Sequence, residues 1–152
     1  MRLWLAAVGR AGADPARALF DTYAARLKPK ITLREVVTRK TIPPERLTEE
    51  EGRLLLSAVP SGAVIVALDE RGKTLSSTDL AKQLGRWRDD AVKDLAFLIG
   101  GADGHSPQVR NSARLVLSLG AMTWPHLLVR AMLAEQLYRA QTILAGHPYH
   151  RG

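Results

Sequence analysis

The sequence contains no cysteine, only four histidines and no long apolar run, and each of these shortages excludes a class of protein. Without cysteine the chain forms no disulfide and has no thiolate to serve as metal ligand or nucleophile, which fits the cytoplasm. No run approaches the roughly 20 apolar residues that a membrane-spanning helix needs. The apolar N-terminal stretch is short and no small-residue cleavage site follows it, so we expect a first β-strand there rather than a signal peptide.

The common catalytic and metal-binding motifs are also missing. The histidines follow no metal-ligand spacing, and there is neither an H-E-x-x-H motif nor a G-x-S-x-G nucleophile elbow. Asp69 and Asp103 lie in loops that contain glycine, but nothing pairs them as acid and base. The G-x-G-x-x-G and P-loop fingerprints for phosphate are absent, which makes a Rossmann-type oxidoreductase a distant alternative. We therefore expect no metal in this protein.

Arginine, by contrast, is abundant. Lysine and arginine total 22 against 15 acidic residues, a net charge of +7, and 16 of the cations are arginines. The forked guanidinium group suits contacts with phosphate, so the composition predicts a polyanionic partner, with nucleic acid as the first candidate. The alternative is a genome that uses arginine wherever a cation is needed.

Strand-like and helical segments alternate along the chain. Short apolar runs predict strands at Leu3–Val8, Ile31–Val37, Ala63–Leu68, Leu95–Ile99 and Leu115–Leu119. Helices are predicted at Pro15–Leu27, after a capping box at Thr48–Glu51, from Ser76 or Ser77 to about Trp87, from Ser106-Pro107, and from about His126 to Ala145, closed by Gly146. This alternation predicts a single α/β domain, residues 1–152, with a mostly parallel sheet and helices on both faces.

Ligands of such sheets bind beyond the carboxyl ends of the strands, so the loops there are the first candidates for a site. These loops follow Leu68, Ile99 and Leu119, and the first of them is expected to span Asp69–Lys73.

Two of these loops have unusual sequences. In Gly100–Gly104 the glycines allow the backbone to approach a ligand and expose its amides; the alternative is a tight strand-to-helix turn. The Gly120–Pro125 loop can bond a planar heterocycle through its backbone, with Met122 and Trp124 as apolar walls. Its alternative is a hydrophobic connector buried under the last helix.

His126 and Arg130 lie one turn apart near the start of the last helix and should share a face. Arg130 can grip a phosphate or a cofactor carboxylate, and His126 can exchange a proton. The alternative is a capping histidine and a structural ion pair. Farther along, Glu135 and Arg139 are spaced as a structural i,i+4 pair.

The tail after the last helix, residues 147–152, is also unusual. It carries two histidines, a tyrosine and an arginine around Pro148, which restricts its own backbone and that of His147. Donors, acceptors and an aromatic face are therefore presented in a narrow range of positions. The alternative is a frayed end.

Together these motifs resemble the RlmH family of SPOUT (α/β-knot) methyltransferases, which methylate N3 of a pseudouridine in bacterial large-subunit ribosomal RNA. The resemblance covers the whole chain in length and element order and is specific over Val64–Arg151. In chain order, the matching segments are Leu68–Lys73, Ile99–Gly104, Ser118–Thr123, Pro125-His126, Leu128–Arg130, Glu135–Ala140 and His147–Arg151.

This resemblance implies a sheet tied in a trefoil knot by the C-terminal segment, with S-adenosyl-L-methionine held in a bent shape by the knotted loops. It also implies a homodimer whose active sites use both subunits and whose substrate is the assembled ribosome. Together with the composition, we expect a cytoplasmic protein with no membrane or metal partner. Carried over by motif, the cofactor contacts are Leu68, Gly101, Gly120, Ala121, Met122, Thr123, Trp124 and Pro125.

The same reaction suggests roles for the remaining candidates. The imide nitrogen of pseudouridine must lose a proton before or during attack on the methyl group. Our hypotheses are His126 or His150 for proton handling, Arg130 or Arg139 for substrate anions, and Tyr149 for stacking on or bonding to the base.

The chain departs from the family pattern at two places. Position 120 is glycine where the family usually has serine, which removes one candidate side-chain contact to the cofactor, and the segment Lys40–Leu47 is shorter than the family's Gly- and Lys-rich loop. Two other functions stay open: a SPOUT methyltransferase with another RNA target, and a knotted, dimeric RNA-binding protein without catalysis.

Overall fold

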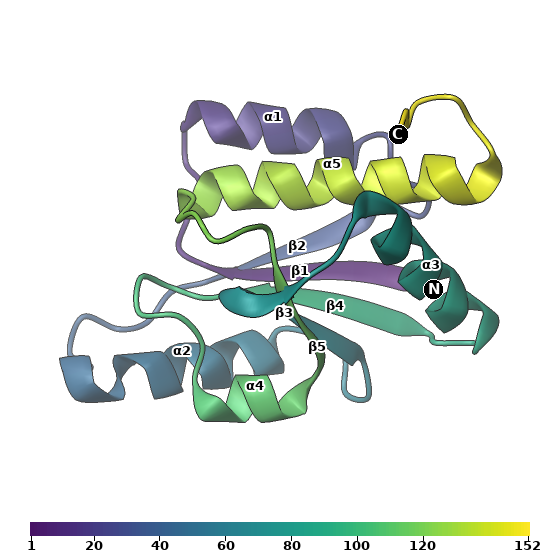
Figure 1. Cartoon of the computed structure of the whole chain (residues 1–152). Coiled ribbons are helices and arrows are strands. Elements are labelled where there is room, and N and C mark those ends of the chain that lie inside the picture. Colours follow the sequence, from purple (N-terminus) through teal and green to yellow (C-terminus); the bar gives the residue numbers. More distant parts are fainter.

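Five parallel strands form one sheet in the order β2-β1-β4-β3-β5 in the computed structural model, which describes residues 1–152 (Figure 1). The α/β class and the parallel sheet predicted from sequence are confirmed. The strands are β1 (Arg2–Val8), β2 (Ile31–Val36), β3 (Val64–Thr74), β4 (Asp94–Ile99) and β5 (Ala113–Ser118). The helices are α1 (Pro15–Ala24), α2 (Pro44–Ser57), α3 (Ser77–Asp89), α4 (Pro107–Ser112) and α5 (His126–Ala145).

Helices cover both faces of the sheet, as predicted. On one face α1, α3 and α5 pack over the larger core, where Phe97 and Leu133 are fully buried (Figure 1). On the other face α2 and α4 pack over a smaller core that includes Leu55, Leu98 and Val109. The central strand β4 contributes to both cores and is buried along its whole length. No helix combines the length and the apolarity required to cross a lipid bilayer.

Most helix ends follow the sequence signals. The hydroxyl oxygens of Ser76 and Ser106 accept bonds from the backbone N–H three residues on, so each caps its helix as expected. Gly146 ends α5 in the left-handed conformation, with φ of 73°. One helix start was predicted wrongly: α2 begins at Pro44, and Thr48 lies inside it rather than at its cap. A proline at the first helical position is favourable by itself, and here it takes precedence over the capping-box pattern.

The strand β3 is longer than predicted and is interrupted. Leu68 and Lys73 both pair with Leu117 of β5, so the four residues between them form an excursion out of the ladder. The loop expected at Asp69–Lys73 is therefore this excursion, with pairing resuming at Lys73 and Thr74. At Gly72 the excursion crosses β5 so closely that a Cβ atom would lie 2.6 Å from the carbonyl oxygen of Val116. The trefoil knot itself stays a prediction.

Candidate functional site

A cavity of about 420 Å³ lies where the carboxyl ends of β3, β4 and β5 meet, between the three loops singled out from the sequence. Seven of the predicted site residues line it: Leu68, Gly101, Gly120, Met122, Thr123, Trp124 and His126. Two predicted cofactor contacts, Ala121 and Pro125, belong to the same loop but do not line the cavity. We call this cavity the edge pocket.

The glycine-rich loop after β4 is both a tight turn and a wall of the edge pocket. The N–H of Gly104 donates to the carbonyl of Gly101 over 3.1 Å, and Gly104 has a φ of 79°. A Cβ atom on Gly100 would lie 2.9 Å from the carbonyl oxygen of Gly104. Because no side chain fits at these positions, the backbone itself faces the cavity. The tight turn is therefore confirmed, and the approach of a ligand to this backbone stays a prediction.

Two buried titratable residues support this loop from behind, and sequence reasoning missed both. The carboxylate of Glu51 lies against Gly101, where a Cβ atom would be 2.7 Å from Oε2; burial and the nearby Asp103 raise the pKa of Glu51. His105 lies 3.1 Å from the carbonyl of Leu98 through Nε2, and burial lowers its pKa. Glu51 precedes the apolar Leu55 by one helical turn, so both lie on the buried face of α2. This spacing could have indicated that Glu51 is buried.

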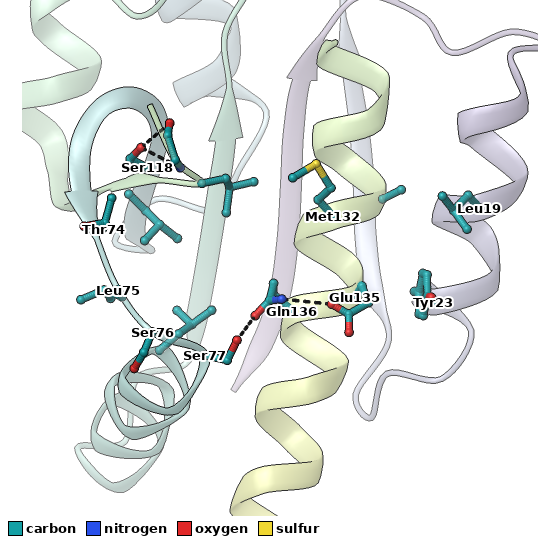
Figure 2. Close-up of a pocket in the computed structure, with 15 residues that line it drawn as sticks. Leu19, Tyr23, Thr74, Leu75, Ser76, Ser77, Ser118, Met132, Glu135 and Gln136 are labelled. Carbon is teal, nitrogen blue, oxygen red and sulfur yellow. Dashed lines mark hydrogen bonds between the residues drawn. The ribbon is translucent and has the colours of Figure 1, made fainter. Parts of the chain in front are cut away.

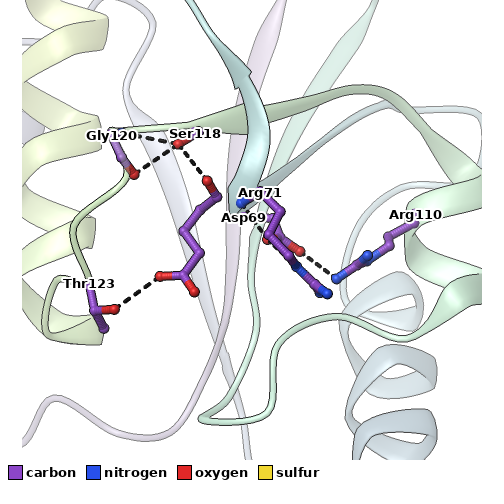
Figure 3. A network of polar contacts seen from close by, with 7 residues as sticks. Asp69, Arg71, Arg110, Ser118, Gly120 and Thr123 are labelled. Carbon is purple, nitrogen blue, oxygen red and sulfur yellow. Dashed lines mark hydrogen bonds and ion pairs between the residues drawn. The ribbon is translucent and has the colours of Figure 1, made fainter.

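Glu70 ties the β3 excursion to the loop after β5, where its partners Ser118 and Thr123 are labelled in Figure 3. Its backbone carbonyl lies 3.0 Å from the hydroxyl of Ser118, which also contacts the backbone of Gly120. At the other end, the hydroxyl of Thr123 donates to the Glu70 carboxylate over 3.0 Å. Two walls of the edge pocket are thus joined through one residue.

The carboxylates around the pocket are not all neutralised. The side chain of Asp69 is 6% exposed and pairs with Arg110 over 2.7 Å, and with Arg71 (Figure 3). Glu70 and Asp103 also line the cavity and form no ion pair. The pocket is therefore anionic in a chain whose net charge is +7.

Arg130 does not share the pocket with His126. Its side chain is 2% exposed, binds Oε2 of Glu35 over 2.6 Å and donates to the carbonyl of Gly9 over 3.1 Å. The same hydrogen bond lowers the pKa of Glu35. The expectation that Arg130 grips a substrate anion is therefore corrected: in this protomer it forms the structural ion pair left open as the alternative. His126 is exposed and lines the cavity, and no side-chain cap bond forms at the start of α5.

The C-terminal tail is ordered against α5 rather than frayed. The hydroxyl of Tyr149 lies 3.2 Å from Oε1 of Glu135, and its ring packs edge-to-face on Tyr138 with centroids 4.8 Å apart. Arg139 lies over the Tyr149 ring, contacts Nδ1 of His150 at 3.1 Å, and forms the predicted pair with Glu135 at 2.6 Å. None of the tail residues lines the edge pocket.

Beside the tail is a second cavity, of about 540 Å³, between α1, α5 and the segment that leads into α3 (Figure 2). Leu19 and Tyr23 of α1 face it, together with Met132 and Glu135 of α5. The hydroxyl of Ser77 bridges its two sides by donating to the side chain of Gln136 over 2.7 Å. We call this cavity the helix pocket. Within one protomer the tail therefore lies next to the helix pocket, whereas the predicted cofactor contacts surround the edge pocket.

Comparison with known proteins agrees with this architecture. A family model described as "Predicted SPOUT methyltransferase" matches residues 1–150. The ribosomal RNA large subunit methyltransferase H of Rhodospirillum centenum is 61% identical over 151 residues, 99% of each chain, and that of Paramagnetospirillum magneticum is 54% identical over the same share. A solved structure of a probable methylase family protein from Haemophilus influenzae has a TM-score of 0.51 at 10% identity, over 99% of this chain and 70% of that one, which shows a shared fold. The chain therefore belongs to the SPOUT methyltransferases, and within them to the family of ribosomal RNA large subunit methyltransferase H.

Proposed function

We propose that this protein transfers the methyl group of S-adenosylmethionine to N3 of a pseudouridine in the large-subunit RNA of the assembled ribosome. Family membership supports the methyltransferase class. The observation that carries the proposal is the edge pocket, which combines exposed backbone, apolar walls and unpaired carboxylates at the carboxyl edge of a parallel sheet.

The residues of the edge pocket fit this cofactor. Backbone groups of Gly101 and Gly120 can bond the adenosine part, and the exposed side chains of Met122 and Trp124 can cover its apolar surface. Glu70 adds a negative charge that suits a sulfonium ion and opposes the phosphates of a dinucleotide. When bound, S-adenosylmethionine supplies an electrophilic methyl group.

The protein's own task is then mainly to align the target base and to manage one proton. His126 is exposed at the rim of the edge pocket and can accept the proton from the imide nitrogen of the base. His150 is the other candidate base, and Tyr149 is the candidate for stacking on the base. Arg139 is placed beside both of them on α5.

We further propose that the active protein is a homodimer, because one protomer does not bring these residues together. Tyr149 and His150 of the tail pack against α5 beside the helix pocket, whereas His126 and the predicted cofactor contacts surround the edge pocket. Leu19, an apolar residue that lines the helix pocket, is also 43% exposed. A second copy that covered this face would bring its own tail towards the edge pocket of the first.

The assembled ribosome as substrate, with RNA as the part contacted, is consistent with the excess of arginine and with a cytoplasmic location. Residues 1–152 are proposed to act as one domain.

Methyl transfer from labelled S-adenosylmethionine to intact ribosomes and to free ribosomal RNA, followed by mapping of the modified base, tests the proposal. We expect transfer to a pseudouridine of the large subunit, and only in the intact ribosome. Transfer to a different base would favour another RNA target. Calorimetry that detects no cofactor binding would favour an RNA-binding protein without catalysis. The tail proposal fails if Tyr149→Ala and His150→Ala retain full methylation and unchanged cofactor affinity.

A further inference from the structure

The carboxyl edge of the sheet is divided by charge. Over β3 and β4 it carries the unpaired carboxylates of Glu70 and Asp103, which line the edge pocket. Over β1 and β2 it carries cations instead: Arg10 lies two residues after the end of β1, and Arg39 and Lys40 follow β2. Because all five strands are parallel, these loops lie at the same edge as the pocket.

The three cations have no partner within the protein. All three side chains are exposed, and none takes part in an ion pair or a side-chain hydrogen bond. The neighbouring carboxylates have other partners, since Asp14 caps α1 and Glu35 binds Arg130. Glu50 lies within electrostatic range of Arg39 but forms its ion pair with Arg53. This half of the edge therefore presents an excess of positive charge.

The loop that carries Arg10 is held on both sides by the ion pair of Arg130 with Glu35. Arg130 donates to the carbonyl of Gly9, and the carboxylate of Glu35 accepts from the N–H of Ala11 over 2.8 Å. The N–H of Gly9 also donates to the carbonyl of Val36 at the end of β2, over 2.9 Å. The backbone on either side of Arg10 is thus fixed to α5 and β2, which gives the buried Arg130 a positioning role.

The order of the strands arranges these cations in a row. β1 lies between β4 and β2, so the loop with Arg10 lies between the edge pocket and the loop with Arg39 and Lys40. Neighbouring strands are about 4.8 Å apart, so the row extends about 10 Å from β4, the length of a few nucleotide steps.

We propose that Arg10, Arg39 and Lys40 bind the phosphate backbone of the RNA beside the target base. The RNA then crosses the β1–β2 half of the edge while the base enters the edge pocket over β3 and β4. This inference rests on the proposed function, and it assigns the RNA contact to the short segment after β2.

A matched pair of triple variants tests it. The first, called the track variant because it removes the proposed row of RNA-binding cations, is Arg10→Gln/Arg39→Gln/Lys40→Gln. The control, Lys28→Gln/Lys30→Gln/Lys93→Gln, removes the same charge from the opposite edge, where Lys28 and Lys30 precede β2 and Lys93 precedes β4. The dissociation constant for ribosomes and for free ribosomal RNA is measured at several salt concentrations, together with that for S-adenosylmethionine.

We expect the track variant to bind ribosomes about tenfold more weakly or worse. The plot of the log of its binding constant against log salt should also become less steep by about 2 to 3, because each lost phosphate contact removes about 0.7–0.9 from the slope. The control should change affinity less than about threefold, and both should bind the cofactor as the parent protein does. Equal losses in track and control variants would overturn the proposal, as would an unchanged salt slope. Weakened binding to ribosomes but not to free RNA would assign these cations to a ribosomal protein and also overturn it. Failure of the parent protein to bind S-adenosylmethionine would instead contradict the proposed function.

Discussion

Replacing Gly72 by alanine should destabilise the fold at the point where the β3 excursion crosses β5. The new Cβ would lie 2.6 Å from the carbonyl oxygen of Val116 and 3.0 Å from the backbone nitrogen of Leu117. Both neighbours are backbone atoms of a paired strand, so no side-chain rotation can relieve the contact. The excursion and β5 must separate by about 0.4 Å even to reach 3.0 Å, which is already a tight contact for a Cβ atom.

Overpacking of this kind costs about 1–3 kcal/mol. For a protein of this size each kcal/mol lowers Tm by about 2–4 °C, so Gly72→Ala should melt roughly 2–12 °C below the parent protein. Its cofactor affinity should fall as well, because the excursion carries Asp69 and Glu70 into the edge pocket. Thermal and chemical denaturation measure the first effect, and titration calorimetry with S-adenosylmethionine the second.

Gly85→Ala is the matched control. Its Cβ would meet the Cδ2 atom of Leu144 at 3.1 Å, the end of a flexible side chain, and alanine is favoured over glycine inside α3 by up to about 1 kcal/mol. The stability of this variant should equal or exceed that of the parent. A Gly72→Ala protein with an unchanged melting temperature would refute the close crossing.

Three further outcomes are expected. Glu70→Gln should reduce the preference for S-adenosylmethionine over its neutral product by about 1.4- to fivefold in paired calorimetric titrations, since an exposed charge contributes about 0.2–1 kcal/mol; an unchanged ratio contradicts the electrostatic role. Burial lowers the pKa of His105 from 6.5, so the unfolded chain takes up a proton first and stability should fall as pH drops below about 6.5. His105→Gln, which keeps a donor for Leu98, should weaken that pH dependence in urea denaturation, and identical profiles would show that this histidine does not titrate differently on folding. Arg130→Met should cost about 2 kcal/mol in the same assay, since it leaves Glu35 half-exposed without its partner; a loss below 0.5 kcal/mol would mean that the pair is not stabilising.

The position of the site could be predicted from the sequence because it depends on local patterns. A buried strand followed by glycines, as at Ile99–Gly104, determines both where a strand ends and where backbone is exposed. In a parallel sheet all such ends meet at one edge, so the edge pocket follows without knowledge of the strand order.

The partners of individual side chains could not be predicted in this way. The spacing of His126 and Arg130 shows that they lie one turn apart, but not that a carboxylate 95 residues away binds Arg130. That partner, Glu35, is brought close by the pairing of β2 with β1, which no local pattern encodes. The buried Glu51 was missed for the same reason, since only the packing of α2 against the glycine loop gives it a role.

The two pockets share a wall: Leu117, Leu119 and Gly120 line both of them. A displacement of this wall changes the shape of both pockets at once. If a ligand in one pocket displaces this wall, it changes the affinity of the other pocket for its own ligand. By thermodynamic reciprocity the factor is the same in both directions. If a second subunit covers the helix pocket, the coupling can be measured in two ways. One is the dissociation constant of the dimer with and without S-adenosylmethionine. The other is the affinity for S-adenosylmethionine at protein concentrations below and above that dissociation constant, and both should give the same factor.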